Sequence, residues 1–540
     1  MRRARQPRRP TAVTAAAAVC LACLACLASG CASAGATGPT PVALARVTLR
    51  RRAPPPLRVR VTVSSRASMV PVPPSYLGLS TEYWALPMWA SRMPLLERAL
   101  ALVRVPGGGP TILRVGGDSS DRSIWDPSAR KLPVWAFTLG PGWIAQARAL
   151  VRRLGIRLLL DLNLITASPA TAAAWARAAQ AGLPRGSIVG FEVGNEPDIY
   201  SRADWRAIIA QRSPGARRRL RLRLPPRLTA GGYVTDFLAD AHALRDVAPA
   251  VPLAGPELAN PIAHRSWVTA LLAGAAGSVG LVSIHRYPYT ACPRLRGTPR
   301  YATIGRLLSE AATNGLATAL APTVAAARRA GVALRLTELN SVNCGGLAGV
   351  SDSFATALWA PGALFALLRA GVAGVNIHVR ASAINAPFAI TARGLTARPL
   401  LYGLILFARA LGPEARLVRV QSRHPRAANV GAWAVRVGAD TLHVVVIDRG
   451  RRSLRVSLRL PATGTAAVQR LLAPSARSRT GVTLAGRTLA ADGGWQGLPV
   501  SQGVARRGGG YVVDVRRESA ALVTVHVSPG ALGAASATRH

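Results

Sequence analysis

The sequence predicts an α/β protein that consists of a (β/α)8 TIM barrel and a C-terminal antiparallel β-sandwich. The chain has 540 residues, half of them hydrophobic, which is enough for two or three domains with a large core. Between residues 71 and 412, eight short apolar runs alternate with helical stretches rich in Ala, Leu and Arg. From residue 413 onward, apolar and polar residues alternate instead, with Gly, Pro and Arg-Arg breaks between the runs.

The eight apolar runs have the length and composition of buried strands. Strand–helix alternation eight times over is typical of a (β/α)8 barrel, so we expect residues 71–412 to form one. In such a barrel the residues that follow the strands form the functional face. The runs are Tyr76–Thr81, Thr111–Val115, Arg157–Leu162, Ile188–Val193, Val251–Gly255, Leu281–His285, Ala333–Thr337 and Gly374–His378.

Residues 413–528 are expected to form the β-sandwich. Its clearest runs are Ala432–Val437, Thr441–Ile447, Ser453–Leu460, Gly510–Val515 and Ala520–Val527. An alternating run at Leu57–Val63 precedes the barrel, and we expect residues 57–70 to add a strand to this domain. Residues 35–56, rich in Pro, Ala, Gly and Arg, and the tail 529–540 are expected to be disordered.

The N-terminal residues 1–34 have the pattern of an export signal. A basic segment precedes a short apolar run, Thr14–Leu27, which is too short for a comfortable membrane span. Residues 28–31, Ala-Ser-Gly-Cys, resemble a bacterial lipoprotein box, and lipidation of Cys31 would tether the protein to a membrane. The alternative is ordinary cleavage after Ala34. We therefore expect an exported protein, either extracellular or anchored to the outer face of the cell membrane.

The formal net charge is +45, and nearly all basic residues are Arg, with Lys131 the single lysine. Because Arg and Ala are abundant throughout, the base composition of the genome is the favoured cause. An acidic partner such as an anionic polysaccharide or a charged envelope is the alternative. The positive charge is scattered and no nucleic-acid-binding motif accompanies it, so we expect no nucleic-acid partner.

Two glutamates that follow apolar runs predict the chemistry. The fourth run leads into Asn195-Glu196-Pro197, and the seventh leads into Glu338. Taken alone, the first motif could be the start of a helix, with Asn195 as its cap. Glycoside hydrolysis needs a pair of carboxyl groups, one to protonate the leaving group and one to attack. The sequence therefore predicts Glu196 and Glu338 as a catalytic pair.

Other strand ends carry carboxylates, amides and aromatic rings, which are the groups that bind sugar hydroxyls and apolar ring faces. They include Glu82, Arg114, Asp118, Asp161, Asn163, Glu257, Asn260, His285, Tyr287, Asn376 and His378. Each has a structural alternative. The Gly-Gly-Asp segment that ends at Asp118 could be only a tight turn. His285 and Tyr287 could be satisfied core residues, and Glu257 and Asp161 are expected to support the site or the fold from behind.

Three segments resemble glycoside hydrolase family 79, the β-glucuronidase and heparanase-like group of the clan A barrels. They are the Asn-Glu-Pro motif at Glu196, the segment Glu338–Gly346, and the Arg-x-Gly-Gly-x-Ser-Ser-Asp segment Arg114–Asp121. Asn-Glu-Pro alone marks only the wider clan, whereas the other two are more specific. The resemblance spans about Leu57 to Val527.

The resemblance implies a retaining mechanism with Glu196 as acid/base and Glu338 as nucleophile. Glu196 must then hold a proton near neutral pH, which requires a raised pKa. By the same resemblance, Asn195 would hold the sugar 2-hydroxyl and Glu82 a distal hydroxyl. The resemblance also implies that two residues position Glu338 and stabilise its charge, namely Tyr287 and Arg114.

In this family the sugar carboxylate is held partly by backbone near a Gly-Gly after the nucleophile and partly by a Tyr after the eighth strand. Gly345 and Gly346 match the first feature. Asn385 stands where the Tyr is expected, a departure that weakens the uronic-acid assignment and leaves the chemistry intact. An amide can donate to a carboxylate, but it is shorter than a Tyr. Asp118 is a further substrate-binding candidate.

Six cysteines are present, four of them in the signal region. In an exported chain the remaining two, Cys292 and Cys344, favour one disulfide, and two buried free thiols are the alternative. Two lone cysteines cannot by themselves make a zinc site. The sequence indicates no metal and no organic cofactor.

The leading hypothesis is a retaining β-glycosidase whose substrate is a β-glucuronide, as a simple glycoside, an oligosaccharide or a polysaccharide. A clan A glycosidase that acts on a neutral sugar is the nearest alternative. From other classes come a catalytically silent carbohydrate-binding surface protein and a polyanion-binding envelope protein. Both glutamates stand in full local motifs, which argues against a silent protein.

Overall fold

The computed structural model describes residues 54–128, 132, 136–200, 228–381, 383–528 and 530–531. The expectations for the export signal at 1–34, including Cys31, for the linker at 35–56 and for the tail at 529–540 fall wholly or largely outside these residues. Within the described part, no helix has the length and apolar character needed to cross a membrane.

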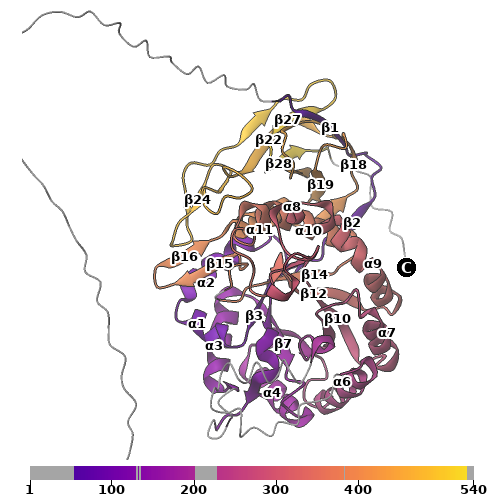
Figure 1. Cartoon of the computed structure of the whole chain (residues 1–540), viewed down its shortest axis with the longest axis vertical. Helices are drawn as coiled ribbons and strands as arrows, with labels where there is room; N and C mark the ends of the chain where they lie inside the picture. The colour runs from indigo at the N-terminus through magenta and orange to yellow at the C-terminus, as the bar shows by residue number, and fades with distance from the viewer. Residues whose placement is uncertain are drawn as a thin grey trace, which may run out of the picture. The chain divides into compact units, whose positions relative to one another are not determined.

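Eight parallel strands close into a barrel, which confirms the predicted fold class (Figure 1). The strands follow one another around the barrel in chain order, and the last pairs with the first. Nearly all of their residues are buried, because one face meets the packed interior and the other meets the helices. The strands are β3 (Leu77–Glu82), β4 (Ile112–Gly116), β7 (Arg157–Leu162), β8 (Ile188–Val193), β9 (Leu253–Leu258), β10 (Val279–Arg286), β12 (Ala333–Leu339) and β14 (Gly374–His378).

Helices surround the barrel strands (Figure 1). They are α1 (Ala85–Ala90), α2 (Met93–Val103), α3 (Pro141–Leu154), α4 (Pro169–Gly182), α6 (Ala230–Leu244), α7 (Arg265–Gly274), α8 (Ile304–Leu307), α9 (Asn314–Arg329), α10 (Phe354–Arg369) and α11 (Pro399–Ala410). Local signals set several ends. Helix α3 starts with Pro141 and stops at Gly155, which adopts the left-handed conformation that favours glycine. Helix α4 is capped by Ser168, whose side chain accepts from the N–H of Thr171.

The C-terminal part is a two-sheet sandwich. The larger sheet contains β2 (Met69–Pro71), β17 (Arg416–Val418), β19 (Val430–Val437), β20 (Thr441–Asp448), β28 (Ser519–His526), β22 (Thr463–Leu472) and β23 (Thr483–Leu484), with β26 (Gln502–Val504) paired to β22. The smaller sheet contains β18 (Gln421–Arg423), β1 (Leu57–Thr62), β21 (Leu454–Arg459) and β27 (Tyr511–Val515). The expected early strand thus joins this part as β1, which runs antiparallel to β18 and parallel to β21. Strand β2 adds a second early strand, to the larger sheet.

Helices α10 and α11 lie between the barrel and the sandwich. Both are buried along almost their whole length, which explains why their sequences are apolar on every side. The ring of Phe365 in α10 stacks on Trp433 of β19, with the ring centroids 5.6 Å apart. Beside them, the buried Arg449 donates to the hydroxyl of Thr313 at 2.8 Å and pairs with Glu310 at 2.9 Å. These contacts fix the sandwich against the side of the barrel.

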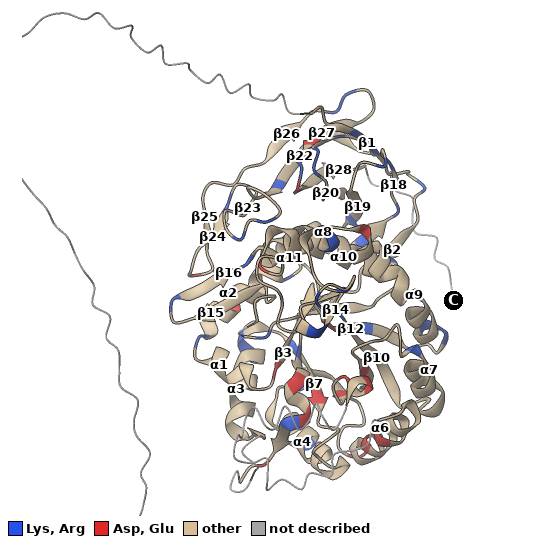
Figure 2. Ribbon diagram, viewed as in Figure 1, with Lys and Arg blue, Asp and Glu red and all other residues tan. Residues whose placement is uncertain are grey.

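Four short two-stranded sheets lie in the loops of the described part of the chain. They are β5 (Ser123–Trp125) with β6 (Phe137–Leu139), β11 (Tyr289–Thr290) with β13 (Val342–Asn343), β15 (Phe388–Thr391) with β16 (Gly394–Ala397), and β24 (Thr488–Leu489) with β25 (Trp495–Gln496). Acidic residues lie on the ribbon near β7 and β10, whereas basic residues are spread over both parts of the chain (Figure 2). The acidic cluster marks the region where the predicted site residues meet.

Candidate active site

The backbone of Glu196 takes a left-handed conformation just beyond β8, with φ of 52° and ψ of 48°. This conformation is uncommon for a residue other than glycine. The N–H of Glu196 donates to the main-chain carbonyl of Glu257 at 3.1 Å, which ties the loop after β8 to β9. A single 3-10 turn, Pro197–Ile199, follows Glu196 without a side-chain cap. Asn195 is not a helix cap either, because its side-chain oxygen accepts from Arg114 at 3.0 Å.

The carboxylate of Glu338, in β12, is held by side chains from three other strands or their loops. Its Oε1 accepts a hydrogen bond of 2.6 Å from the hydroxyl of Tyr287. Its Oε2 accepts from Nη1 of Arg114 at 3.0 Å and lies 3.3 Å from Nδ1 of His378. The side chain is 10% exposed, so one edge of the carboxylate remains open to a ligand.

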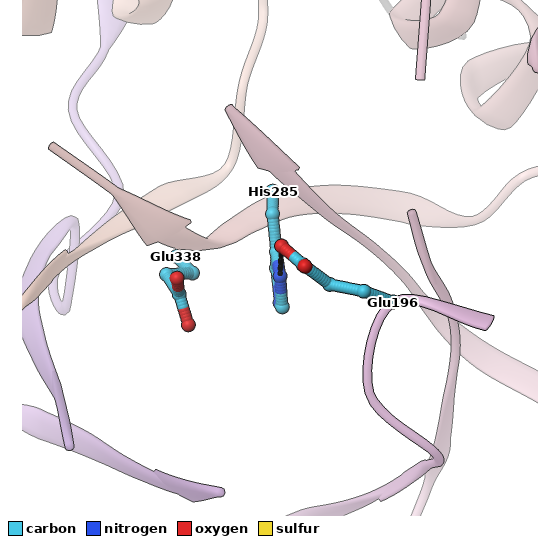
Figure 3. A group of neighbouring side chains, drawn as sticks. All are labelled: Glu196, His285 and Glu338. Carbon is cyan, nitrogen blue, oxygen red and sulfur yellow. Dashed lines mark hydrogen bonds and ion pairs between the residues drawn. The ribbon is translucent and has the colours of Figure 1, made fainter. Parts of the chain in front are cut away.

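Glu196 and Glu338 lie on either side of His285, which comes from β10 (Figure 3). One carboxylate oxygen from each glutamate and one ring nitrogen of His285 all lie within 4.8 Å of one another. Carboxyl groups of retaining glycosidases are about 5–5.5 Å apart, and those of inverting enzymes about 6.5–9.5 Å. This close approach of one oxygen from each glutamate is compatible with the shorter of these two separations.

The two carboxyl groups have different proton affinities. Burial raises the pKa of Glu196 to about 7, and the charge of Glu338 adds to the rise although His285 opposes it. Burial would raise the pKa of Glu338 too, but the groups around it, above all His378 and His285, hold that pKa well below its usual range. Near neutral pH the first carboxyl can carry a proton while the second is ionised, which is the division that acid catalysis and nucleophilic attack require.

Arg114, on β4, is wholly buried and joins the acidic groups beneath the site. Its guanidinium pairs with four carboxylates, those of Asp161 at 2.6 Å, Glu192 at 2.9 Å, Glu338 at 3.0 Å, and Glu257. Burial alone would lower the pKa of Arg114, but these carboxylates raise it, so the guanidinium keeps its charge. Breaking a buried ion pair by removing one partner typically costs about 3–5 kcal/mol. The network therefore holds the ends of five strands in one arrangement.

Two groups of described residues bring together enough ligand atoms to hold a metal ion. They are Glu196, His285 and Glu338, and Asp161, Glu192 and Glu257. In the second group the guanidinium of Arg114 contacts all three carboxylates and supplies the positive charge. In the first, burial would lower the pKa of His285, but the surrounding carboxylates raise it to about 10, so the imidazole itself is a cation. Each acidic group thus already has a cationic partner from the chain.

Both glutamates line a cleft of about 680 Å³. The predicted substrate-binding residues that share its lining are Glu82, Asp118, Tyr287, Gly345 and Asn385. Asn195, Arg114 and Gly346 lie outside the lining. The cleft also includes residues that the sequence did not single out, namely Asp198, His264, Arg294, Arg300 and Arg380. The structure therefore brings most of the predicted set to one surface and adds several basic groups to it.

One corner of the cleft is built around Glu82. Burial raises the pKa of Glu82 to about 7, and the neighbouring Asp118 adds to the rise. Its Oε2 accepts from the N–H of Ser119 at 2.9 Å. Arg380 pairs with Asp118 at 3.1 Å, and its Nε lies 4.0 Å from Oε1 of Glu82. This corner offers acceptors and a cationic donor to a polar ligand.

The expected donors for a sugar carboxylate are only partly available. The side-chain nitrogen of Asn385 donates to the carbonyl of Val342 at 2.7 Å, and its buried oxygen has no partner among the described residues. The N–H of Gly346 donates to the carbonyl of Asn343 at 3.2 Å. No described residue accepts from the N–H of Gly345, which lines the cleft. Asn385 therefore donates its amide N–H to the main chain, contrary to the expectation that it donates to a ligand, and its oxygen is buried.

Cys292 and Cys344 form a disulfide with their Cα atoms 5.4 Å apart, which confirms the predicted pairing. The bridge links the loop after β10 to the loop after β12, and strands β11 and β13 pair between the same two loops. Both cysteines line the cleft. The disulfide thus fixes one wall of the site close to Glu338.

Two acidic residues of the site were missed by the sequence analysis. Glu192 sits inside the apolar run of β8 and turns into the barrel towards Arg114, so a lone charge within a buried strand was the available signal. Asp198 accepts from the N–H groups of Ala259 and Asn260 at 2.8 and 2.9 Å and clamps the loops after β8 and β9 together. No local pattern in the sequence marks that long-range contact.

Residues 428–522 match the model of the glycosyl hydrolase family 79 C-terminal beta domain. The chain carries the family 79 C-terminal domain. This match confirms the resemblance to family 79, and it falls on the sandwich, from just before β19 into β28. No sequence among the curated proteins compared with the chain matches it.

Solved structures resemble this chain over most of its length. A 4-O-α-L-rhamnosyl-β-D-glucuronidase from Fusarium oxysporum 12S, in complex with Rha-GlcA, is 19% identical, with a TM-score of 0.67 over 86% of this chain and 100% of that one. A family 51 arabinofuranosidase from Xanthomonas axonopodis pv. citri is 14% identical, with a TM-score of 0.62 over 87% and 100%. An α-L-arabinofuranosidase from Thermotoga maritima is 15% identical, with a TM-score of 0.63 over 87% and 100%. At these sequence identities, the similarity is evidence for the fold alone.

Proposed function

We propose that the protein is a retaining glycoside hydrolase that cleaves β-linked sugars, with β-glucuronides preferred. One observation carries the proposal. Oxygen atoms of Glu196 and Glu338 lie within 4.8 Å of each other in an open cleft, and the two carboxyl groups differ in proton affinity. A family 79 domain in the same chain supports it.

In the proposed cycle, ionised Glu338 attacks the anomeric carbon of the bound sugar. Protonated Glu196 donates its proton to the glycosidic oxygen as the bond to the leaving group breaks. The covalent glycosyl-enzyme ester that forms on Glu338 removes that residue's negative charge, so Glu196, now ionised, can act as a base. It takes a proton from water, which attacks the anomeric carbon, displaces the carboxylate of Glu338 and releases the sugar with its original configuration.

The sugar carboxylate has two candidate partners in this chain. One is the N–H of Gly345, which no described residue uses, and the other is the guanidinium of Arg380. The structural relative from Fusarium oxysporum is named as a β-D-glucuronidase, which also favours a uronic acid. Asn385 opposes this assignment, because its side-chain nitrogen already donates to the carbonyl of Val342.

A neutral sugar is the second candidate. A hydroxymethyl group can donate to the carboxyl of Glu82, which lines the cleft, whereas a carboxylate cannot. An unpaired buried polar group costs about 1–3 kcal/mol, so each assignment leaves one group on the protein unsatisfied. We expect the guanidinium of Arg380 and the N–H of Gly345 to make the glucuronide the better substrate, by roughly tenfold in kcat/KM.

The test compares 4-nitrophenyl β-D-glucuronide with the matching β-glucoside and β-galactoside at the same pH and salt. A Glu338→Gln variant, purified in parallel, reports any contaminating glycosidase. Preference for the glucuronide, lost in Glu338→Gln, supports the proposal. Equal or faster cleavage of a neutral glycoside contradicts the uronate assignment alone, and absence of cleavage of any aryl glycoside contradicts the hydrolase assignment.

A further inference from the structure

Glu257 is held in an uncommon conformation directly behind the acid/base candidate. It lies in β9 with φ of 55°, and it is fully buried. A side-chain-bearing residue in this region costs of order 1–3 kcal/mol and persists only where the surroundings enforce it. Here its main-chain carbonyl accepts the hydrogen bond from the N–H of Glu196 at 3.1 Å. The backbone of one glutamate thus sets the backbone position of the other.

The side chain of Glu257 is also connected to Glu196, through the ring of His285. Its Oε1 accepts from the hydroxyl of Thr337 at 2.9 Å, and its Oε2 pairs with Arg114. The same Oε2 lies 3.3 Å from Nε2 of His285, an ion-pair contact rather than an aligned hydrogen bond. On the other side of the ring, Nδ1 of His285 lies 3.1 Å from Oε1 of Glu196 (Figure 3). The imidazole therefore bridges the two carboxyl groups.

We propose that Glu257 is a positioning residue for the acid/base step and that it acts on Glu196 through His285. This inference rests on the proposed glycosidase function. A cationic imidazole donates from both ring nitrogens, so it can fix Oε1 of Glu196 while Oε2 stays free to face the leaving-group oxygen. Without the charge of Glu257, the cationic form of His285 is less stable and the orientation of its ring is less restrained.

Three carboxylates face His285, those of Glu196, Glu257 and Glu338, and they come from the loop after β8, from β9 and from β12. Burial would lower the pKa of His285, but these charges raise it to about 10, with Glu257 the strongest of them. Neutralising Glu257 must lower the pKa of His285. Glu196 then loses part of its cationic neighbour, so its own pKa rises and it keeps its proton to higher pH.

Asp161 provides a matched control. It is as deeply buried as Glu257 and pairs with the same guanidinium, at 2.6 Å, but its hydrogen bonds and ion pairs within the described residues do not reach the imidazole of His285. Asp161→Asn therefore removes a buried charge next to Arg114 without touching the bridge to the acid/base. A loss of activity that both variants share is due to the ion network around Arg114. A difference between the two variants is due to the contact through His285.

The experiment measures kcat/KM of wild type, Glu257→Gln and Asp161→Asn on phenyl and 2,4-dinitrophenyl β-D-glucuronide. A general acid contributes about 100- to 10,000-fold where the leaving group is poor. We expect Glu257→Gln to lower kcat/KM for the phenyl substrate about tenfold or more beyond any loss on the dinitrophenyl substrate. The pH above which its kcat/KM falls should move upward. Asp161→Asn should lower kcat/KM equally on both substrates, and the pH above which kcat/KM falls should not change. Equal losses on both substrates and no such upward move in Glu257→Gln overturn the inference.

A second measurement does not depend on turnover. In protein labelled at its 8 histidines, the ring resonances of His285, assigned with a His285→Gln variant, should titrate at lower pH in Glu257→Gln than in wild type. An unchanged titration overturns the inference. If Glu257→Gln does not fold, Glu257→Asp keeps the charge at a shorter reach, and a selective loss on the phenyl substrate is again expected. A wild type that cleaves neither glucuronide contradicts the uronate assignment of the proposed function instead, and the same comparison is then made with the aryl glycosides that it does cleave.

Discussion

The hydroxyl of Tyr287 donates a hydrogen bond of 2.6 Å to Oε1 of Glu338. Burial and the adjacent charge of Glu338 raise the pKa of Tyr287 well above its ordinary value, so the phenol stays protonated and remains a donor. A hydrogen bond to a charged group contributes about 1.5–3 kcal/mol. We expect Tyr287→Phe to lower kcat/KM for an aryl glucuronide about 10- to 100-fold.

Tyr289 is the control for that substitution, because it follows on the same loop and its hydroxyl lies 3.3 Å from Ser309 rather than near the glutamates. Tyr289→Phe should change kcat/KM little. Similar kinetics for the two variants would show that the contact between Tyr287 and Glu338 does not assist the reaction.

The pH dependence of kcat/KM should report the proton on Glu196. Burial raises the pKa of this residue to about 7, so the acid form is lost as pH rises through neutrality. The pKa of Glu338 lies well below its usual range, so the nucleophile remains ionised far into the acidic range. With a phenyl glycoside, kcat/KM is expected to fall above about pH 7. A rate that still rises beyond pH 8 would contradict this assignment of the acid.

Removing the acid/base should separate substrates by their leaving groups. Glu196→Ala should spare the first step for a dinitrophenyl glycoside, which needs little protonation, and should abolish it for a phenyl glycoside. Azide should restore turnover of the dinitrophenyl substrate and yield a glycosyl azide, because a small anion needs no base to attack the ester. Equal losses on both substrates, without rescue, would remove Glu196 from this role.

The disulfide between Cys292 and Cys344 should stabilise the fold. Closing a loop with a sequence separation of 52 contributes about 4 kcal/mol by the chain-entropy relation. A double substitution to serine should lower the free energy of unfolding in denaturant by about that amount. Wild type treated with a reductant serves as the control and should match the variant. A variant as stable as oxidised wild type would show that the bridge adds nothing.

The barrel strands were predictable because each is a short apolar run between helical stretches, and seven of the eight lie within two residues of their expected ends. The fifth strand shows the limit. The expected run Val251–Gly255 stops before Pro256 and Glu257, whereas β9 spans Leu253–Leu258 and carries Glu257 inside the strand. A charge in mid-strand breaks the apolar pattern, and only its partners across the barrel, such as Arg114, explain its place.

The catalytic pair was predictable because each glutamate follows its own strand in a recognisable motif. The orientation of Asn385 was not, because it depends on the carbonyl of Val342, which lies 43 residues away in the chain. The arginines of the cleft were hidden for another reason. In a chain of net charge +45 a single Arg carries no signal, so Arg380 becomes informative only when it is seen beside Asp118 and Glu82.

Covalent trapping tests the central claim, that Glu338 attacks the sugar directly. The protein is incubated with 2,4-dinitrophenyl 2-deoxy-2-fluoro-β-D-glucuronide and is then digested for mass spectrometry. The fluorine of this compound slows both steps, and its dinitrophenyl leaving group keeps formation of the ester faster than its hydrolysis. We predict one added fluorosugar per chain, on the peptide that contains Glu338, and none on a Glu338→Gln variant treated in the same way. If wild type turns over the unfluorinated glucuronide with inversion of configuration, or carries the label on another residue, the retaining mechanism through Glu338 is wrong.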